Sequence, residues 1–260
     1  MSERFVDDGR PSSPRRRYTG LCLPKRIASR FIWVERRLFR SPQPEEHILR
    51  WTSRLLSRGG TFFDVGAHYG WIAIAAAHCV GRSGRVFAFE PSPILLDILL
   101  HHKQANRLPQ MEVIARAVSD VDAEFVPFFL LNKGLSFRNS LTIGPDDTPY
   151  VTAEEKTKYD VGSVTLDRFV ADSRIVPDLV KIDVEGAELL VLQGAESLLA
   201  RHHPALILGV HSYWLPRWQT VGQILDFLNR HQYQIEEEHV VPFEGGYIAD
   251  YLCTQRRTNP

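Results

Sequence analysis

The sequence predicts an α/β protein with a Rossmann-like fold: a seven-stranded, mostly parallel sheet, helices on both of its faces, and an antiparallel strand near the C-terminus. Three observations support this. Short apolar runs typical of buried strands alternate with helical patterns from residue 61 to residue 230. Residues 61–90 read as a strand, a glycine-containing turn, a helix and a second strand, which together make a βαβ unit. The last two strand patterns have no helix between them, so they can pair as an antiparallel hairpin.

The composition fits one large domain. The chain has 260 residues, of which 44% are hydrophobic, and this is enough for a full core. Its formal net charge is zero, so no nucleic acid is expected as a partner. The three cysteines (Cys22, Cys79 and Cys253) have neither metal-binding nor redox spacing, which favours a reducing compartment. Because no apolar run reaches about 18 residues, no membrane span is expected, and we expect the protein in the cytoplasm.

The first 58 residues are expected to lie outside the main fold. Residues 1–20 are polar and rich in arginine and proline, and we expect them to be disordered. Residues 21–58 are expected to form a helical segment that packs on the domain formed by residues 59–260. Between Lys25 and Arg40, apolar residues recur at helical spacing among arginines. This pattern favours a helix docked on its own domain, with contact to an anionic membrane surface as the alternative.

The turn after the first strand indicates what the βαβ unit binds. A dinucleotide site needs Gly-x-Gly-x-x-Gly around a pyrophosphate, but the carboxylate of Asp64 stands at the first glycine position and would repel phosphates. S-Adenosylmethionine (SAM) has no phosphate and carries an ammonium and a sulfonium group, which a carboxylate at roughly 4 Å attracts by about 4 kcal/mol at an effective dielectric of about 20. Gly66 and Gly70 let the backbone approach a ligand, and Glu90 can accept hydrogen bonds from a ribose diol. The turn therefore favours a SAM site over a nucleotide-dependent oxidoreductase, the runner-up.

The elements outside the βαβ unit continue the α/β alternation with one interruption. Helices are expected over 45–57, 94–106, 164–171, 186–200 and 221–230, and strands over 111–118, 179–183, 204–210, 233–241 and 246–253. Residues 122–163 break the pattern with an apolar run and polar turns. We expect an irregular insertion with one or two short antiparallel strands, which serves as a lid over the acceptor and whose middle moves in the free protein.

A second group of polar residues falls at the ends of two adjacent strands. Lys181 and Asp183 share one face of a buried strand, so the lysine is expected in a structural ion pair with Asp183 or with Glu185. His211 ends the next strand and should lie across the same cleft. Glu188, one helical turn after Glu185, is expected to form a local cap or pair.

These motifs together resemble the FkbM family of SAM-dependent methyltransferases. The resemblance rests on DVGAHYG from Asp64, FEP around Glu90 and KIDVEGAE from Lys181, and it runs from about residue 45 to residue 255. It implies the class I methyltransferase fold, SAM as cofactor, and hydroxyl acceptors on sugars, lipids or secondary metabolites. The cofactor contacts expected from the turn and from the resemblance are Asp64, Gly66, Ala67, His68, Gly70, Glu90, Ala117, Val118, Ser119 and Asp183. His68 departs from the asparagine more usual in the family, but both residues tolerate positive φ.

The catalytic residues expected are His211, Asp183 and Glu185. An alkyl hydroxyl needs a base within about 3 Å to take its proton as the methyl group transfers. His211 is expected to be this base, because the ordinary pKa of imidazole is nearest neutrality, while Asp183, whose pKa Lys181 lowers, orients cofactor or acceptor. A metal held by Asp183 and Glu185 is the less favoured alternative because no third ligand stands at useful spacing, so no metal is predicted.

Two further expectations qualify this assignment. The family often carries an acid two residues before the histidine, where this chain has Gly209, so the acceptor is expected to be held differently or to differ. A binding module that keeps the fold without turnover, and contacts a partner through residues 25–40, is the alternative from another functional class.

Overall fold

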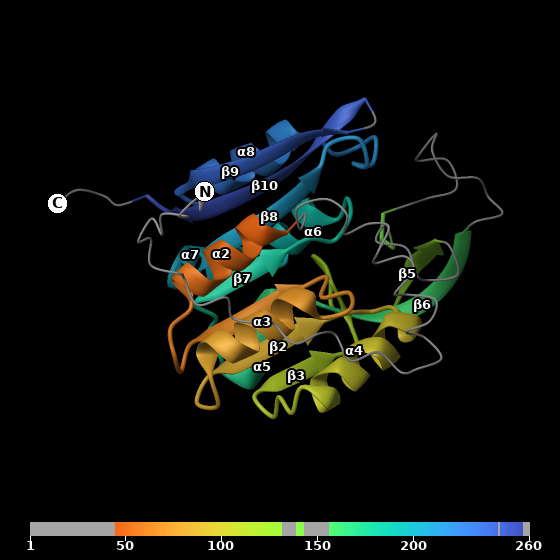
Figure 1. The fold of residues 1–260 in the computed structure, drawn as a ribbon. Helices are drawn as coiled ribbons and strands as arrows, with labels where there is room; N and C mark the ends of the chain where they lie inside the picture. Colours follow the sequence, from red (N-terminus) through yellow and green to blue (C-terminus); the bar gives the residue numbers. More distant parts are fainter. Residues whose placement is uncertain (1–44, 132–138, 143–155, 244, 257–260) are drawn as a thin grey trace, which may run out of the picture.

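In the computed structural model the chain is described over residues 45–131, 139–142, 156–243 and 245–256 (Figure 1). The expected tail over 1–20, the basic stretch over 25–40 and the middle of the insertion lie outside the described residues. The expectations about them therefore stay predictions. Among the helices that the structure describes, none has the length and apolar character needed to cross a membrane.

Seven strands form the main sheet in the order β3-β2-β1-β7-β8-β10-β9. They are β1 (Thr61–Val65), β2 (Arg85–Phe89), β3 (Met111–Ile114), β7 (Leu179–Ile182), β8 (Ala205–His211), β9 (Tyr233–Phe243) and β10 (Gly246–Gln255). Strands β3, β2, β1, β7 and β8 are parallel, and β10 runs antiparallel to both of its neighbours, β8 and β9. The predicted seven-stranded sheet and its C-terminal hairpin are confirmed.

Helices cover both faces of this sheet (Figure 1). On one face lie α2 (Glu46–Leu55), α3 (Trp71–Val80) and α4 (Pro93–Ala105). On the other lie α5 (Leu166–Ser173), α6 (Glu188–Gln193), α7 (Glu196–His202) and α8 (Val221–Arg230). The alternation of side chains along a strand explains this division, because neighbouring residues of β1 belong to opposite cores. Phe62 belongs to the same core as Trp51 of α2 and Ile72 of α3, whereas Phe63 belongs to the core that includes Leu192 of α6 and Phe227 of α8.

The predicted strand over 111–118 is wrong, because it is two strands in different sheets. The first, β3, ends at Ile114, where the N–H of Arg116 donates to the carbonyl of Ile114 in a tight turn. The second, β4 (Ala117–Val118), belongs to a smaller sheet with β5 (Ala123–Leu131) and β6 (Lys156–Val164), in the order β4-β6-β5. This smaller sheet lies beside the main one, on the right of Figure 1. The insertion thus contains an antiparallel pair, as predicted, but each strand has nine residues and is not short.

The predicted helix over 186–200 is also wrong, because it is interrupted between α6 and α7. The cause is the smaller sheet, which approaches the backbone at this point. A Cβ on Gly194 would lie 2.0 Å from the carbonyl oxygen of Ser119, which directly follows β4. The Gly194 carbonyl accepts a hydrogen bond from the N–H of Asp167 at 2.9 Å, and the N–H of Leu198, which would bond this carbonyl in a continuous helix, donates to Asp167 Oδ1 at 2.7 Å instead.

Candidate active site

The turn after β1 brings the ends of three strands together. The N–H groups of Gly66 and Ala67 both donate to the carbonyl of Phe89 at the end of β2, at 3.1 and 3.0 Å. Gly66, His68 and Gly70 have positive φ values of 79°, 52° and 84°, so the backbone geometry expected at His68 is confirmed. A Cβ at Gly66 would lie 2.0 Å from the carbonyl oxygen of Asp183, just after β7. Only glycine allows this approach.

Glu90 follows β2 directly and is 4% exposed. One carboxylate oxygen accepts from the N–H of His68 and the other from the N–H of Ser92, both at 2.9 Å. Burial raises the pKa of Glu90 to about 7, and the two N–H groups oppose this rise. Because each oxygen can accept a further hydrogen bond, the group retains the capacity to bind a diol.

Asp64 and Lys181 form a buried ion pair between β1 and β7. The two residues are directly opposite in register, and they are 1% and 4% exposed. Lys181 Nζ lies 3.4 Å from Asp64 Oδ1 and 3.3 Å from Asp183 Oδ2, so the predicted structural ion pair with Asp183 is confirmed and Asp64 is a second partner. Burial works against the charge of Lys181, but Asp183 and Asp64 outweigh it and raise its pKa. The cation that the Asp64 carboxylate faces here is therefore Lys181.

The loop after β7 is held in place by the carboxylate of Glu188, which follows it in the sequence. Gly186 donates its N–H to both oxygens of Glu188, at 3.0 and 3.1 Å, and Glu188 is fully buried at the start of α6. The local cap expected of Glu188 is thus confirmed. Glu185 does not continue the strand, which ends at Ile182, and it has a φ of 54°. This left-handed conformation turns the loop so that the Glu185 carboxylate reaches His211.

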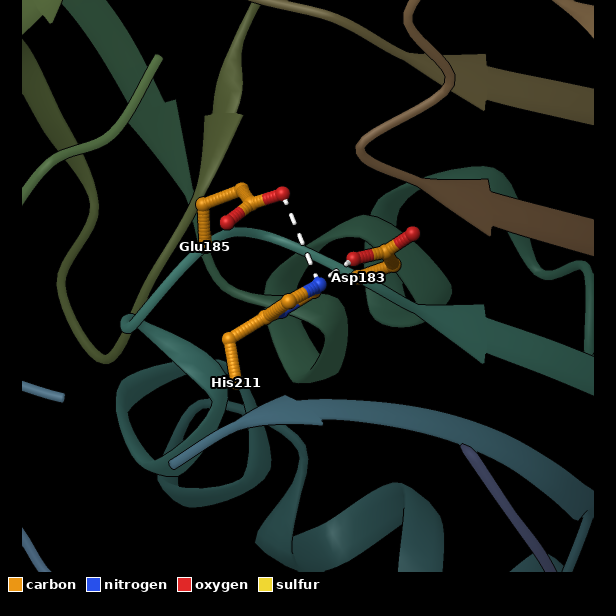
Figure 2. Close-up of side chains that lie close together, drawn as sticks. All are labelled: Asp183, Glu185 and His211. Carbon is orange, nitrogen blue, oxygen red and sulfur yellow. Dashed lines mark ion pairs between the residues drawn. The ribbon is translucent and has the colours of Figure 1, made fainter. Parts of the chain in front are cut away.

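Asp183, Glu185 and His211 meet at the carboxyl ends of β7 and β8. Figure 2 shows the two carboxylates pointing toward the imidazole from the β7 side. Glu185 Oε1 lies 3.6 Å from Nε2, and Asp183 Oδ1 lies 3.9 Å from Nδ1. The predicted position of His211 across the cleft is confirmed. Moreover, one ligand atom from each of the three residues lies within 4.8 Å of the other two, so His211 could supply the third metal ligand that sequence spacing does not reveal.

The charges in this cluster shift two pKa values. Burial alone would lower the pKa of His211, but the carboxylates, that of Glu185 first, outweigh burial and raise it. Burial alone would raise the pKa of Asp183, but Lys181 and then His211 lower it, in the direction expected from the sequence. The cluster therefore favours positive charge between the two carboxylates.

The remaining residues expected at the cofactor, Ala117, Val118 and Ser119, lie in or next to β4. They follow Ile114, whose carbonyl accepts the N–H of Glu90 at 3.1 Å. All three are buried, and the Ser119 N–H donates to the carbonyl of Val164. This segment is thus continuous with the strand end beside Glu90.

Sequence reasoning missed several residues near the cluster. Asp250 in β10 stands opposite Gly209 in register and bonds Nε2 of His47 in α2 at 2.8 Å. Ser140 donates its hydroxyl to the carbonyl of Val184 at 3.4 Å, which joins the insertion to the loop after β7. The two contacts join residues 203 and 44 positions apart. No local pattern signals such contacts.

A family model described as the methyltransferase FkbM domain matches residues 64–235. No curated protein matches the chain. Similar solved structures include a putative rRNA methylase from Clostridium thermocellum, with 10% identity, a TM-score of 0.52, and coverage of 83% of this chain and 98% of that one.

An rRNA methylase from Streptococcus thermophilus has 9% identity, a TM-score of 0.50 and the same coverage. The FkbM methyltransferase from Methylobacillus flagellatus KT has 15% identity and a TM-score of 0.45, over 78% of this chain and 50% of that one. At these identities the first two likenesses establish a shared fold and nothing finer.

Proposed function

The chain belongs to the FkbM family of methyltransferases, whose domain model covers residues 64–235, and from this we propose that it methylates a hydroxyl oxygen of a small molecule. The methyl donor is S-adenosylmethionine. The observation that carries the proposal is the cluster of Asp183, Glu185 and His211, which stands at the carboxyl ends of two parallel strands. Ligands bind at this edge in open α/β sheets.

On the cofactor side, we assign Glu90 to the ribose and the turn from Gly66 to Gly70 to the methionine portion. The two carboxylate oxygens of Glu90 match the two hydroxyls of a ribose. Ala67 and His68 contribute backbone to this turn, and Ala117, Val118 and Ser119 follow the strand end next to Glu90, where the adenine would lie. Asp64 is buried behind the turn and paired with Lys181, so its role is to set the charge of the site with Lys181.

On the acceptor side, Asp183, Glu185 and His211 handle the hydroxyl group. The methyl carbon of SAM is already activated, so the protein has to place the acceptor oxygen in line with the carbon and the sulfur and promote loss of the hydroxyl proton. Three polar side chains that converge on one point can hold such an oxygen.

The acceptor that we propose is a small molecule, although two fold neighbours are described as rRNA methylases. A formal net charge of zero gives the chain no general attraction to a polyanion. We also propose a cytoplasmic location, which the sequence supports, because its three cysteines have neither metal-binding nor redox spacing.

Turnover with methyl-labelled SAM tests the proposal. Sugars, hydroxylated lipids, hydroxylated small metabolites and total RNA are offered as acceptors, and SAM and NAD binding are compared by isothermal titration. We expect SAM to bind, NAD not to bind, and label to enter a small hydroxylated acceptor. His211→Ala should lower kcat by about a hundredfold or more with unchanged SAM affinity.

The matched control is His202→Ala, which removes an exposed histidine at the end of α7 and should leave kcat unchanged. Labelling of RNA alone would overturn the small-molecule acceptor. SAM binding without transfer to any acceptor would point to a binding module.

A further inference from the structure

We propose that Asp183, Glu185 and His211 bind a divalent metal cation, with one oxygen from each carboxylate and one imidazole nitrogen as ligands. The binding site is inferred from these residues alone. Its role in methyl transfer rests on the proposed function.

The geometry is the first argument. One ligand atom from each residue lies within 4.8 Å of the other two; Glu185 Oε1 approaches Nε2 of His211 at 3.6 Å, and Asp183 Oδ1 approaches Nδ1 at 3.9 Å. Donor atoms that share one ion at about 2.1 Å lie roughly 3 Å apart in an octahedral site. Small side-chain rotations therefore bring the three donors onto a common ion. The backbone that carries them is fixed, because β7 and β8 pair directly and Glu188 caps the loop between β7 and α6.

The second argument is that buried polar atoms in the cluster lack hydrogen bonds. Within the described part of the chain, Asp183 Oδ1 and His211 Nδ1 are both buried and neither has a hydrogen-bond partner. They face each other at 3.9 Å, which is too long for a hydrogen bond. His211 as a whole is 9% exposed. Burying such atoms without a partner destabilises a protein by about 1–3 kcal/mol each, and a bound ion would satisfy both.

Charge is the third argument. Lys181 is matched by Asp64, which is buried against it and needs a positive partner. Asp183 contacts Lys181 through Oδ2, which leaves Oδ1 turned toward His211. With Lys181 and Asp64 cancelled, Asp183 and Glu185 carry two negative charges at one point. A divalent cation neutralises both.

The ligand set indicates which cations suit the site. Carboxylate oxygens favour Mg²⁺ and Mn²⁺, and imidazole favours the later transition metals, so two oxygens and one nitrogen together favour Mn²⁺. Three protein ligands leave positions for water and for the acceptor oxygen.

A hydroxyl bound to the cation is held in place and loses its proton more readily, here to water. Its oxygen then bonds to the methyl carbon as the carbon–sulfur bond of SAM breaks, which leaves the methylated acceptor and S-adenosylhomocysteine. In this arrangement His211 acts as a ligand and not as the proton acceptor expected from the sequence.

Mn²⁺ binding to the full chain, freed of metal and of any purification tag, tests the proposal. Free Mn²⁺ gives a six-line electron paramagnetic resonance signal that disappears on binding, so stoichiometry and Kd can be titrated directly. We expect one Mn²⁺ per chain, and at least a tenfold weaker Kd in Glu185→Gln, His211→Ala and Asp183→Asn. Asp172→Asn, an exposed carboxylate on α5, is the control and should bind like the wild type. We also expect EDTA to stop methyl transfer and Mn²⁺ to restore it.

SAM titration of each variant shows whether it is folded, so a variant that binds SAM but not Mn²⁺ supports the site. Wild-type protein that binds no Mn²⁺, or variants that bind it with unchanged Kd, overturn the metal site. A wild type that binds and uses SAM without Mn²⁺ overturns the role of the metal in methyl transfer and leaves the proposed function intact. Mn²⁺ binding without methyl transfer to any acceptor overturns the proposed function and leaves the metal site intact.

Discussion

At the scale of single residues, two carboxylates at the same edge of the sheet have pKa values that move in opposite directions. Burial raises the pKa of Glu90 to about 7. Its hydrogen-bond partners, the neutral N–H groups of His68 and Ser92, oppose this rise only in part. Asp183 is partly buried, but the ammonium of Lys181 lies 3.3 Å away and the pKa of Asp183 falls. One site thus contains a carboxylate whose pKa is lowered by a neighbouring cation and one whose pKa burial raises toward neutrality.

The titration of Glu90 makes SAM binding dependent on pH. The ionised carboxylate accepts the ribose hydrogen bonds better than the neutral acid, so SAM binding should strengthen as the pH rises through about 7. We expect Kd to fall by about tenfold between pH 6 and pH 8, since the ionised fraction of a group with a pKa near 7 rises by that factor. Isothermal titration at five pH values measures this.

Glu90→Gln is the control for this prediction. It should bind SAM more weakly by about 1.5–3 kcal/mol, the usual scale for a hydrogen bond to a charged group, and its Kd should not change with pH.

The raised pKa of Glu90 also makes the stability of the free protein dependent on pH. Because the folded value of about 7 exceeds the ordinary 4.5, the stability that Glu90 contributes is complete below about pH 4.5 and is lost as the pH rises through 7. A Glu90→Gln variant with the pH slope of the wild type would show that another group titrates.

The sequence could predict residues that a local feature marks, but not contacts between residues that lie far apart in the sequence. Glu90, Asp183 and His211 were found because each stands at or just after the end of a strand, which is a local feature. The pairing of Asp64 with Lys181 was not found, since it depends on which strands are neighbours and on their register. The position of His211 near Asp183 and Glu185 was expected, but the left-handed turn at Glu185 that brings its carboxylate within 3.6 Å of Nε2 was not.

At the scale of the elements, the turn after β1 and the loop after β7 are packed directly against each other. The turn has positive φ at three positions, and its Gly66 lies against the carbonyl of Asp183. Gly66 therefore has two requirements, a left-handed backbone and no side chain. Gly245, in the turn between β9 and β10, has nearly the same φ, 82° against 79°, but a Cβ added there would have no atom within 4 Å.

These two glycines separate the effect of backbone conformation from that of packing. Gly245→Ala should cost about 1–2 kcal/mol of unfolding free energy, which is the usual penalty for a left-handed alanine. Gly66→Ala should cost clearly more, about 3 kcal/mol or above, because the new methyl group would lie 2.0 Å from a backbone oxygen and the strand end must move. Urea unfolding gives both values. SAM titration should show weaker binding for Gly66→Ala only, and equal losses in the two variants would contradict the close approach.

The elements themselves were largely predictable, and the misses have one origin. Helices α2, α3, α4 and α8 and the seven main strands follow from apolar periodicity within each segment. The split between α6 and α7 and the end of β3 at Ile114 do not, because both are imposed by the smaller sheet formed by residues far along the chain. Periodicity contains no information about such an approach.

At the scale of the whole molecule, the insertion contacts the loop after β7, which carries Asp183 and Glu185. Strands β5 and β6 extend beside the main sheet in Figure 1. Ser140, between them in sequence, forms an isolated bridge with Phe129 of β5 and also donates to Val184 in the loop that carries Glu185. This arrangement supports the expectation that residues 122–163 form a wall of the acceptor pocket, although their middle lies outside the described residues.

Hydrogen exchange tests whether this wall opens. Phe129 and Ser140 are joined by two hydrogen bonds, at 2.9 and 3.1 Å, in a bridge that no further pair extends among the described residues. Strand β7 is paired on both sides and all four of its residues are buried. Local opening costs little free energy where few hydrogen bonds and little apolar surface are involved, so the bridge amides should exchange at least about a hundredfold faster than those of β7 in the free protein.

S-Adenosylhomocysteine should slow exchange at residues 64–70 and leave exchange of the bridge amides fast. Adding an acceptor found with labelled SAM should slow exchange of the bridge amides as well. Bridge amides that exchange as slowly as β7 in the free protein would mean that the insertion is a fixed part of the fold and does not close over an acceptor.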